Sequence, residues 1–176
     1  MSRCIEVVAP AGWEDRAAEL LGLAASCPCP HRTAVVTGGA ERSDSVATCL
    51  AVLSDAVDLV LVHDAARCFT PPEVFGRVVD AVRAGAAGAV PALPVVDTIK
   101  VVEQATSGSA DGEILLEQTP AREHLRAAQT PQGFDLRQLR DANEAYFSGA
   151  QDFVATDDAS LMEWHGVPVT TVPGDP

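Results

Sequence analysis

Two short polar strings in the sequence have residue types that could bind a ligand carrying phosphate. The first is VVTGGAERSDSV (35–46), which begins as an apolar run and contains two adjacent glycines. At Gly39 the backbone can approach a ligand closely, and Arg42 and Ser45 offer side-chain donors. The helix expected to follow would add free backbone N–H groups, which favour anions. The same residues also suit a plainer role, as a tight turn between a strand and a capped helix.

The second string is VLVHDAARCFTPP (60–72), in which a carboxylate directly follows an apolar run. In an enzyme that acts on nucleotides, Asp64 would hold Mg²⁺ or a ribose hydroxyl at this place. Arg67 could offer a two-pronged guanidinium to a phosphate. Alternatively, Asp64 only caps the next helix and His63 packs in the core. Ligands of open α/β sheets bind at strand ends, so the two strings together favour a phosphate-bearing ligand.

A third group of polar residues lies between residues 97 and 133. Its members are Thr98, Lys100, Arg122, Arg126 and Thr130. Hydroxyl and guanidinium groups suit a phosphate monoester. Charged residues on an exposed hairpin often do no more than protect its edge, so that alternative stays open.

The string TDDASLMEWHG (156–166) holds two adjacent carboxylates near the end of the chain. It is most simply interpreted as a helix with Thr156 at its N-cap and acidic residues in its first turn. A metal-binding role for Asp157 or Asp158 is therefore secondary.

Short apolar runs alternate with segments of helical period along most of the chain, and these elements must position the polar strings. Strands are expected near residues 5–8, 33–37, 59–62, 88–91 and 167–172. Helices are expected near residues 13–24, 43–53, 71–82 and 136–146. Ser43 or Asp44 is expected to cap the second of these helices. The alternation predicts an α/β protein with a Rossmann-like, mostly parallel sheet.

The alternation stops between residues 97 and 133, where helical period is absent. The polar tract QATSGSADGE (104–113) contains the glycine and serine residues that mark a turn. We therefore expect residues 97–133 to form an extended β-arm on a single domain.

The composition excludes several classes of function. The chain has 176 residues, 47% of them hydrophobic, which is enough for the core of one domain. Its 25 acidic and 12 basic residues give a net charge of −13, which argues against sequence-independent binding of nucleic acid or an anionic membrane. We see no signal peptide and no apolar run of about 18 residues, the length of a membrane span. Cys27 and Cys29 have no second pair or cluster of histidines nearby to complete four metal ligands. The five cysteines therefore fit reduced thiols in a soluble cytoplasmic protein.

Five strings in order along the chain resemble the 2-C-methyl-D-erythritol 4-phosphate cytidylyltransferases, CTP-using enzymes of the non-mevalonate isoprenoid pathway. The strings are VVTGGAERSDSV, VLVHDAAR, VPALPVVDTIK (90–100), LRAAQTPQGF (125–134) and ATDDASLMEWHGVPVTTVPGD (155–175). The resemblance covers nearly the whole chain. It implies a Rossmann-like nucleotidyltransferase fold with a protruding β-arm, and transfer of CMP from CTP to the polyol phosphate with release of pyrophosphate.

The resemblance also implies roles for single residues. Gly39 and Ser45 would lie at the cytosine and its ribose. Asp64 would lie by the triphosphate and Mg²⁺, and Arg67 by the methylerythritol phosphate. The arm positions that grasp the substrate phosphate in the family correspond to Thr98, Arg122 and Thr130. Because those arms interlock between subunits in the family, a homodimer with shared sites is expected.

The sequence departs from the family pattern at three places. Cys68 replaces the proline that usually follows HDAAR. Nothing corresponds to the family's opening strand and its glycine-rich loop with Arg and Lys, and the chain stops before the family's Asn-x-Lys segment. We therefore expect residues 1–176 to be an incomplete domain with weak or no activity. Lys100 does not replace the missing lysines by position, and Asp175 is left without a role.

Two other functions stay open. One is a cytidylyltransferase for a different polyol phosphate, such as ribitol 5-phosphate, which a panel of substrates would distinguish. The other is a non-catalytic remnant that binds nucleotide or polyol phosphate, or that dimerises with an intact copy. Binding of a phosphate ligand without turnover would favour the remnant.

Overall fold

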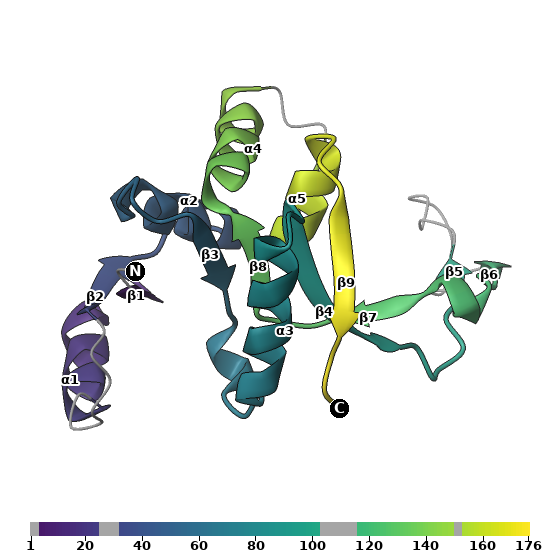
Figure 1. The fold of residues 1–176 in the computed structure, drawn as a ribbon, viewed down its shortest axis with the longest axis horizontal. Helices are drawn as coiled ribbons and strands as arrows, with labels where there is room; N and C mark the ends of the chain where they lie inside the picture. Colours follow the sequence, from purple (N-terminus) through teal and green to yellow (C-terminus); the bar gives the residue numbers. More distant parts are fainter. Residues whose placement is uncertain (1–3, 25–31, 103–115, 150–152) are drawn as a thin grey trace, which may run out of the picture.

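A computed structural model describes residues 4–24, 32–102, 116–149 and 153–176. Figure 1 shows sheets and helices that form a body, and a β-arm that projects from it. The Cys27 and Cys29 pair and the polar tract 104–113 lie outside the described residues. Among the helices of the described ranges, none is long and apolar enough to cross a membrane.

The first sheet has two parallel strands from the start of the chain. β1 (Cys4–Ala9) pairs with β2 (Arg32–Thr37) along its whole length. α1 (Glu14–Ala24) connects the two strands and packs against β2, and α2 (Arg42–Val52) follows β2 after a short turn. This order of strands and helices is the one that the sequence predicts.

The second sheet has five strands: β3 (Leu59–Val62), β4 (Gly88–Pro94), β7 (Arg126–Ala128), β8 (Gln132–Asp135) and β9 (Val169–Pro173). β8 lies between β3 and β4 and is antiparallel to both. β7 pairs antiparallel with the last part of β4, and β9 pairs parallel with β4 on its other side.

The α/β class is confirmed, but a mostly parallel sheet is not observed. Three of the four strand pairs in the second sheet are antiparallel. The arm causes this difference, because the chain leaves the end of β4 and returns beside it through β7 and β8, with no crossover helix in the described part of the connection. A chain that returns in this way must run antiparallel. β3, β4 and β9 still share one direction, as the prediction required.

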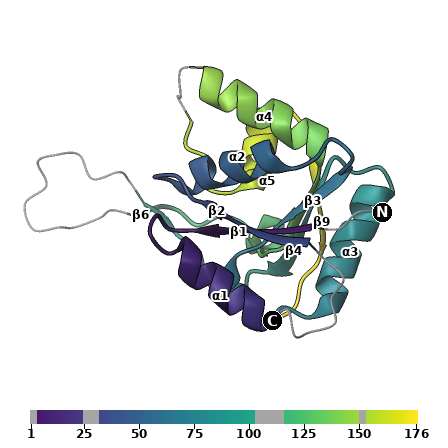
Figure 2. The same ribbon diagram turned by 90° about the vertical axis from the view of Figure 1, so that its left-hand side faces the viewer.

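Helices cover both faces of the sheets. α3 (Pro72–Arg83) packs against β4, β8 and β9, whereas α4 (Leu136–Ser148) and α5 (Asp158–Trp164) pack on each other and on the second sheet. Figure 2 shows α2, α4 and α5 on one side of the sheets and α1 and α3 on the other. The main core lies under α4 and α5, where Phe134 and Leu139 are fully buried.

The arm carries a short antiparallel pair, β5 (Val101–Val102) and β6 (Leu116–Gln118). Two side-chain hydrogen bonds join its two legs. Lys100 Nζ donates to Thr119 Oγ1 over 2.7 Å, and Arg122 Nη1 donates to the Val96 carbonyl over 2.8 Å. The described part of the predicted arm thus contains one antiparallel strand pair, its last residues join the second sheet through β7 and β8, and it presents apolar side chains to solvent. These are Val96, Ile99, Val101, Val102 and Leu116.

Candidate active site

The turn after β2 is held in one shape by its own hydrogen bonds. The Gly39 N–H donates to Ser45 Oγ over 3.1 Å, and Ser45 Oγ in turn donates to the Glu41 carbonyl over 3.1 Å. A side chain at Gly39 would collide with Cβ of Asp44, so the close approach of turn and helix requires glycine. The structure therefore joins two of the predicted site residues, Gly39 and Ser45, in one turn.

The N-cap of α2 differs from the prediction. It is Glu41, whereas Ser43 and Asp44 lie inside the first turn of the helix. Asp44 Oδ2 accepts the Glu41 N–H over 3.0 Å. A capping residue is recognised by its type, and Ser and Asp are more usual caps than Glu, which explains the error of two to three positions.

Arg42, at the start of α2, forms an ion pair with Asp158 at the start of α5. Arg42 Nη2 donates to Asp158 Oδ2 over 2.6 Å, and the Asp158 side chain is only 3% exposed. Burial raises the pKa of the Asp158 carboxyl, and the hydrogen bond and charge of Arg42 oppose this effect. The pair ties the turn after β2 to a helix from the end of the chain.

Three carboxylates lie near enough to Arg42 for their charges to affect its pKa, and one of them, Asp158, contacts it. Burial works to lower the pKa of Arg42, but the hydrogen bond and charge of Asp158, with the charges of Asp64 and Asp157, outweigh it and raise the pKa. Such charge effects act over short distances. Asp64 in the second polar string thus lies within electrostatic range of Arg42 in the first, with no hydrogen bond or ion pair between them among the described residues.

Asp157 is the N-cap of α5, where the sequence predicted Thr156. Its Oδ1 accepts the Ser160 N–H over 2.8 Å, and its Oδ2 accepts a hydrogen bond from Gln132 Nε2 over 2.7 Å. Burial works to raise the pKa of Asp157, but the hydrogen bonds from Gln132 and Ser160 outweigh this effect and lower it. Both carboxylate oxygens of Asp157 are therefore occupied by hydrogen bonds that stabilise the fold, and the Asp158 carboxylate is occupied by its pair with Arg42.

Asp64 and Arg67 bracket a short 3₁₀ helix, Ala65–Arg67, directly after β3. Arg67 N–H donates to the Asp64 carbonyl over 2.9 Å, but the Asp64 side chain does not cap the helix. Arg67 Nε lies 3.9 Å from Asp64 Oδ2, and the two side chains are 43% and 48% exposed. The Asp64 carboxylate is therefore accessible to a ligand. The alternative role, in which this side chain only caps the next helix, does not fit, because its oxygens accept no capping hydrogen bond.

Thr130 lies between β7 and β8, where the arm returns to the body, and it is only 6% exposed. Its Oγ1 accepts the N–H of Asp64 over 3.1 Å and lies 3.1 Å from His63 Nδ1. The structure thus brings Thr130 next to Asp64, at the base of the arm. His63 is partly buried and packs edge-on against Phe75 of α3, with ring centroids 5.0 Å apart.

Thr98 and Arg122 lie on the arm, and both are exposed. Arg122 starts a short 3₁₀ helix, Arg122–His124, and binds the Val96 carbonyl. Figure 1 shows the arm extending away from β3, the strand that precedes Asp64. Within one chain the structure does not bring Thr98 or Arg122 to Asp64.

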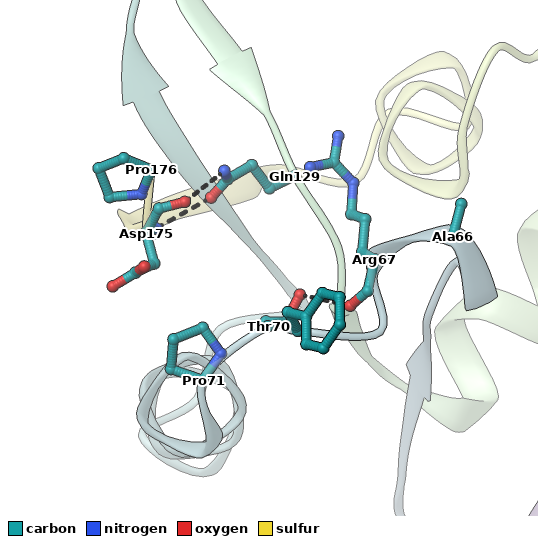
Figure 3. Close-up of a pocket in the computed structure, with 8 residues that line it drawn as sticks. Ala66, Arg67, Thr70, Pro71, Gln129, Asp175 and Pro176 are labelled. Atoms are coloured by element: carbon teal, nitrogen blue, oxygen red, sulfur yellow. Dashed lines mark hydrogen bonds between the residues drawn. The ribbon is translucent and has the colours of Figure 1, made fainter.

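A pocket of about 230 Å³ lies beside Arg67, between the 3₁₀ helix and the segment that follows β9. Its lining includes Thr70, Gln129 and Asp175. Figure 3 shows the two hydrogen bonds that join Gln129 to the Asp175 backbone, one from Gln129 Nε2 over 2.7 Å and one to Gln129 Oε1 over 3.0 Å. The pocket offers a polar space that a small phosphate ester could enter next to the Arg67 guanidinium.

The described residues could bind Mg²⁺ only if a phosphate ligand supplied the remaining oxygen ligands. The described ranges contain no group of three or more His, Cys, Asp or Glu side chains that could hold a metal ion. Asp64 supplies one accessible carboxylate, and Mg²⁺ in nucleotide enzymes often binds one or two carboxylates together with substrate phosphates. Asp64 is the described residue best placed to bind such an ion.

Sequence reasoning missed Gln132 entirely. Its side chain is 2% exposed, donates to Asp157 and accepts the Ala159 N–H over 3.1 Å, so it fixes the start of α5. The sequence also indicated only a packing role for His63, whereas in the structure His63 contacts Thr130. A polar residue within an otherwise apolar strand, as in Gln132-Gly133-Phe134, was the available signal for Gln132.

The chain matches one known protein family over nearly its whole length, and the match includes these motifs. Residues 2–176 match the family of 2-C-methyl-D-erythritol 4-phosphate cytidylyltransferase (IspD). The chain is similar to the protein of that name from Corynebacterium diphtheriae, with 51% identity over 81% of the chain and 54% of the relative. It is also similar to the one from Nocardia farcinica, with 49% identity over 98% of the chain and 66% of the relative.

Solved structures show the same relationship in three dimensions. The fold is similar to 2-C-methyl-D-erythritol 4-phosphate cytidylyltransferase from Thermus thermophilus, with a TM-score of 0.73 and 34% identity over 98% of this chain and 72% of that one. The 4-diphosphocytidyl-2C-methyl-D-erythritol synthase from Anaerococcus prevotii gives a TM-score of 0.81 at 27% identity, also over 98% and 72%.

The chain spans 54% to 66% of the length of the first four curated relatives. The match nevertheless runs through every motif that positions the candidate site, from the turn after β2 to the segment after β9. The chain therefore belongs to the 2-C-methyl-D-erythritol 4-phosphate cytidylyltransferase (IspD) family.

Proposed function

We propose that the protein transfers CMP from CTP to 2-C-methyl-D-erythritol 4-phosphate and releases pyrophosphate. The observation that carries this proposal is that the Gly39–Ser45 turn contains Arg42, whose guanidinium is within electrostatic range of the exposed Asp64 carboxylate. The turn suits a nucleoside, and the charged groups suit its phosphates. Family membership supplies the identity of both substrates.

In the proposed reaction, a phosphate oxygen of the polyol phosphate attacks the α-phosphorus of CTP. The new P–O bond replaces the bond between the α-phosphorus and the bridging oxygen, and the β- and γ-phosphates leave together as pyrophosphate. The protein forms no covalent bond to either substrate. Its residues therefore act by positioning the reactants and by balancing charge at the phosphates.

Asp64 would bind the divalent cation, which lowers the charge repulsion among phosphates when CTP is bound. Gly39 and Ser45 would hold the cytidine side of the nucleotide through the fixed turn. Arg67, beside the 230 Å³ pocket, would face the phosphate of the second substrate. Arg42 would hold the turn in place and would not bind the ligand directly, because its guanidinium is already paired with Asp158.

Thr98 and Arg122 enter the proposal through a second copy of the chain. They lie on an arm that projects from the body and carries exposed apolar residues, which is typical of a surface that packs against a partner. We propose a homodimer in which each arm reaches the partner's site, with Thr130 at the base of each arm. Sedimentation of the chain at micromolar concentration should give twice the monomer mass, and a monomer would contradict this arrangement.

The proposal places the protein in the cytoplasm, where CTP is available. The described cysteines Cys4, Cys49 and Cys68 are all free thiols, in agreement with a reducing compartment. The described body and arm are proposed to work as one domain.

Calorimetric titration with CTP in the presence of Mg²⁺ tests the first half of the proposal. We expect the Asp64→Asn variant to bind at least about tenfold more weakly, because it loses the charge that holds the cation. Asp80→Asn, an exposed carboxylate on α3, is the matched control and should bind like the original chain. Equal binding by the Asp64 variant would contradict the cation role.

Pyrophosphate release tests the second half. CTP and Mg²⁺ are offered with 2-C-methyl-D-erythritol 4-phosphate, and ribitol 5-phosphate serves as the comparison substrate. Release with the first polyol phosphate alone supports the proposal. Release only with ribitol 5-phosphate would assign a different substrate, and binding of CTP without any release would indicate a non-catalytic protein.

A further inference from the structure

His63 contacts the candidate site through the hydroxyl of Thr130. Thr130 Oγ1 is the meeting point of two contacts, since it accepts the Asp64 N–H over 3.1 Å and lies 3.1 Å from His63 Nδ1. The Thr130 side chain is almost fully buried, so water cannot easily replace either contact. The position of the Asp64 backbone therefore depends on how the Thr130 hydroxyl is oriented.

A threonine hydroxyl has one proton to donate and two lone pairs that accept. The Asp64 N–H uses one lone pair, because a backbone N–H can only donate. Within the described ranges, His63 Nδ1 is the only other atom hydrogen-bonded to Thr130 Oγ1. The hydroxyl proton is satisfied if Nδ1 accepts it, whereas a proton on Nδ1 would leave the hydroxyl proton without an acceptor. A buried donor with no acceptor is costly, so the first arrangement is favoured.

We infer that His63 is a positioning residue that acts through Thr130 on Asp64, with its proton on Nε2 and its Nδ1 accepting the Thr130 hydroxyl. The edge-on contact with Phe75 of α3, at 5.0 Å between ring centroids, fixes the plane of the imidazole. The result is a chain of contacts from α3 to the backbone of Asp64. This inference rests on the proposed role of Asp64 in binding CTP and Mg²⁺.

Nitrogen-15 NMR of the histidine rings tests the hydrogen bond without any substrate. Long-range proton–nitrogen correlations distinguish a ring protonated on Nε2 from one protonated on Nδ1. In the original chain we expect His63 to carry a proton on Nε2 and none on Nδ1. Thr130→Val should shift the His63 Nδ1 resonance, whereas Thr130→Ser, which keeps a hydroxyl, should preserve it. A proton on Nδ1 of His63 in the original chain overturns the inference.

Two substitutions of His63 test its positioning role. Asn places a polar atom near the position of Nδ1, so His63→Asn can still accept from Thr130, whereas the longer side chain of His63→Gln places its amide near the position of Nε2. We expect the affinity for CTP with Mg²⁺ to stay within about threefold for the Asn variant and to fall on the order of tenfold for the Gln variant. The matched controls are His165→Asn and His165→Gln, at the exposed C-cap of α5, and both should bind normally.

The outcomes separate the inference from the function on which it rests. If the original chain binds CTP and His63→Gln binds it equally well, the positioning role is wrong and the proposed function stands. If the original chain binds no CTP in Mg²⁺, the proposed function fails, and the role of His63 toward it fails as well. Urea unfolding of each variant identifies any loss of affinity that comes from loss of the fold.

Discussion

The body of the protein and its arm hold their predicted site residues in different ways. In the body, the Gly39–Ser45 turn is held by its own hydrogen bonds, and the Asp64 N–H donates to the almost fully buried Thr130 hydroxyl. On the arm, Arg122 is exposed, and among the described residues its side chain is hydrogen-bonded to one carbonyl of the neighbouring leg. The predicted site residues of the body are therefore held by the chain itself, whereas in the proposed homodimer those of the arm would be held by the partner. Substitutions should follow this division, with large losses of stability in the body and small ones on the arm.

The largest effect is expected for Arg42→Ala. This change leaves the buried Asp158 carboxylate without its partner, and we expect the free energy of unfolding to fall by about 3 kcal/mol at neutral pH. Urea unfolding measures the loss. Arg16→Ala is the control, because Arg16 pairs with Glu19 on the exposed surface of α1 and should change stability by no more than about 0.5 kcal/mol.

The same variant should respond to pH in a defined direction. Burial raises the pKa of Asp158 in the folded state, and removal of Arg42 takes away the effect that opposes this rise. A group whose pKa is raised by folding gives full stability below its unfolded pKa and loses it as the pH rises through the folded pKa. The deficit of Arg42→Ala should therefore be small in acid and grow toward neutral pH. A deficit that is constant across this range would mean that Asp158 is not its source.

A smaller loss is expected for Gln132→Met, which keeps the volume of the side chain but removes one buried and one partly buried hydrogen bond. The Ala159 N–H and one Asp157 oxygen lose their partner, so we expect a loss of about 2 kcal/mol in the free energy of unfolding. Gln118→Met on the exposed arm is the matched control and should cost less than about 0.5 kcal/mol. Similar losses for the two variants would contradict the division between body and arm.

The smallest effect on stability is expected for Arg122→Ala, within about 0.5 kcal/mol, because Arg122 is exposed. If the arm binds substrate phosphate in a dimer, the KM for the polyol phosphate should nevertheless rise at least about tenfold, since a charged hydrogen bond is lost. The affinity for CTP should not change. A weaker affinity for CTP with an unchanged KM for the polyol phosphate would show that the arm serves the nucleotide instead.

The sequence predicted the order of strands and helices well because each element carries its own periodicity. The run LVLV at 59–62 became β3, and the apolar spacing after Pro71 became α3, with Val74 and Val78 buried. Strand direction was a different problem. Whether β8 runs parallel or antiparallel depends on the path of the arm, and no local pattern in residues 132–135 encodes that path.

The candidate site was predicted in part for a similar reason. Gly39 and Ser45 lie six residues apart, so a turn signal could place them together. The partner of Arg42 is 116 residues away, and the contact between His63 and Thr130 spans 67 residues. Such partners become visible only once the sheets have brought distant strand ends to one edge.

The pairing of Gln129 with Asp175 extends the sheet beyond its last strand. β9 ends at Pro173, yet the Gly174 N–H still donates to the Ala92 carbonyl, over 3.1 Å, and the Asp175 backbone is held on both its donor and its acceptor by one side-chain amide. That amide replaces the backbone of a neighbouring strand. The amide proton of Asp175 should consequently exchange with deuterated solvent as slowly as those of β9, although the residue lies in no strand.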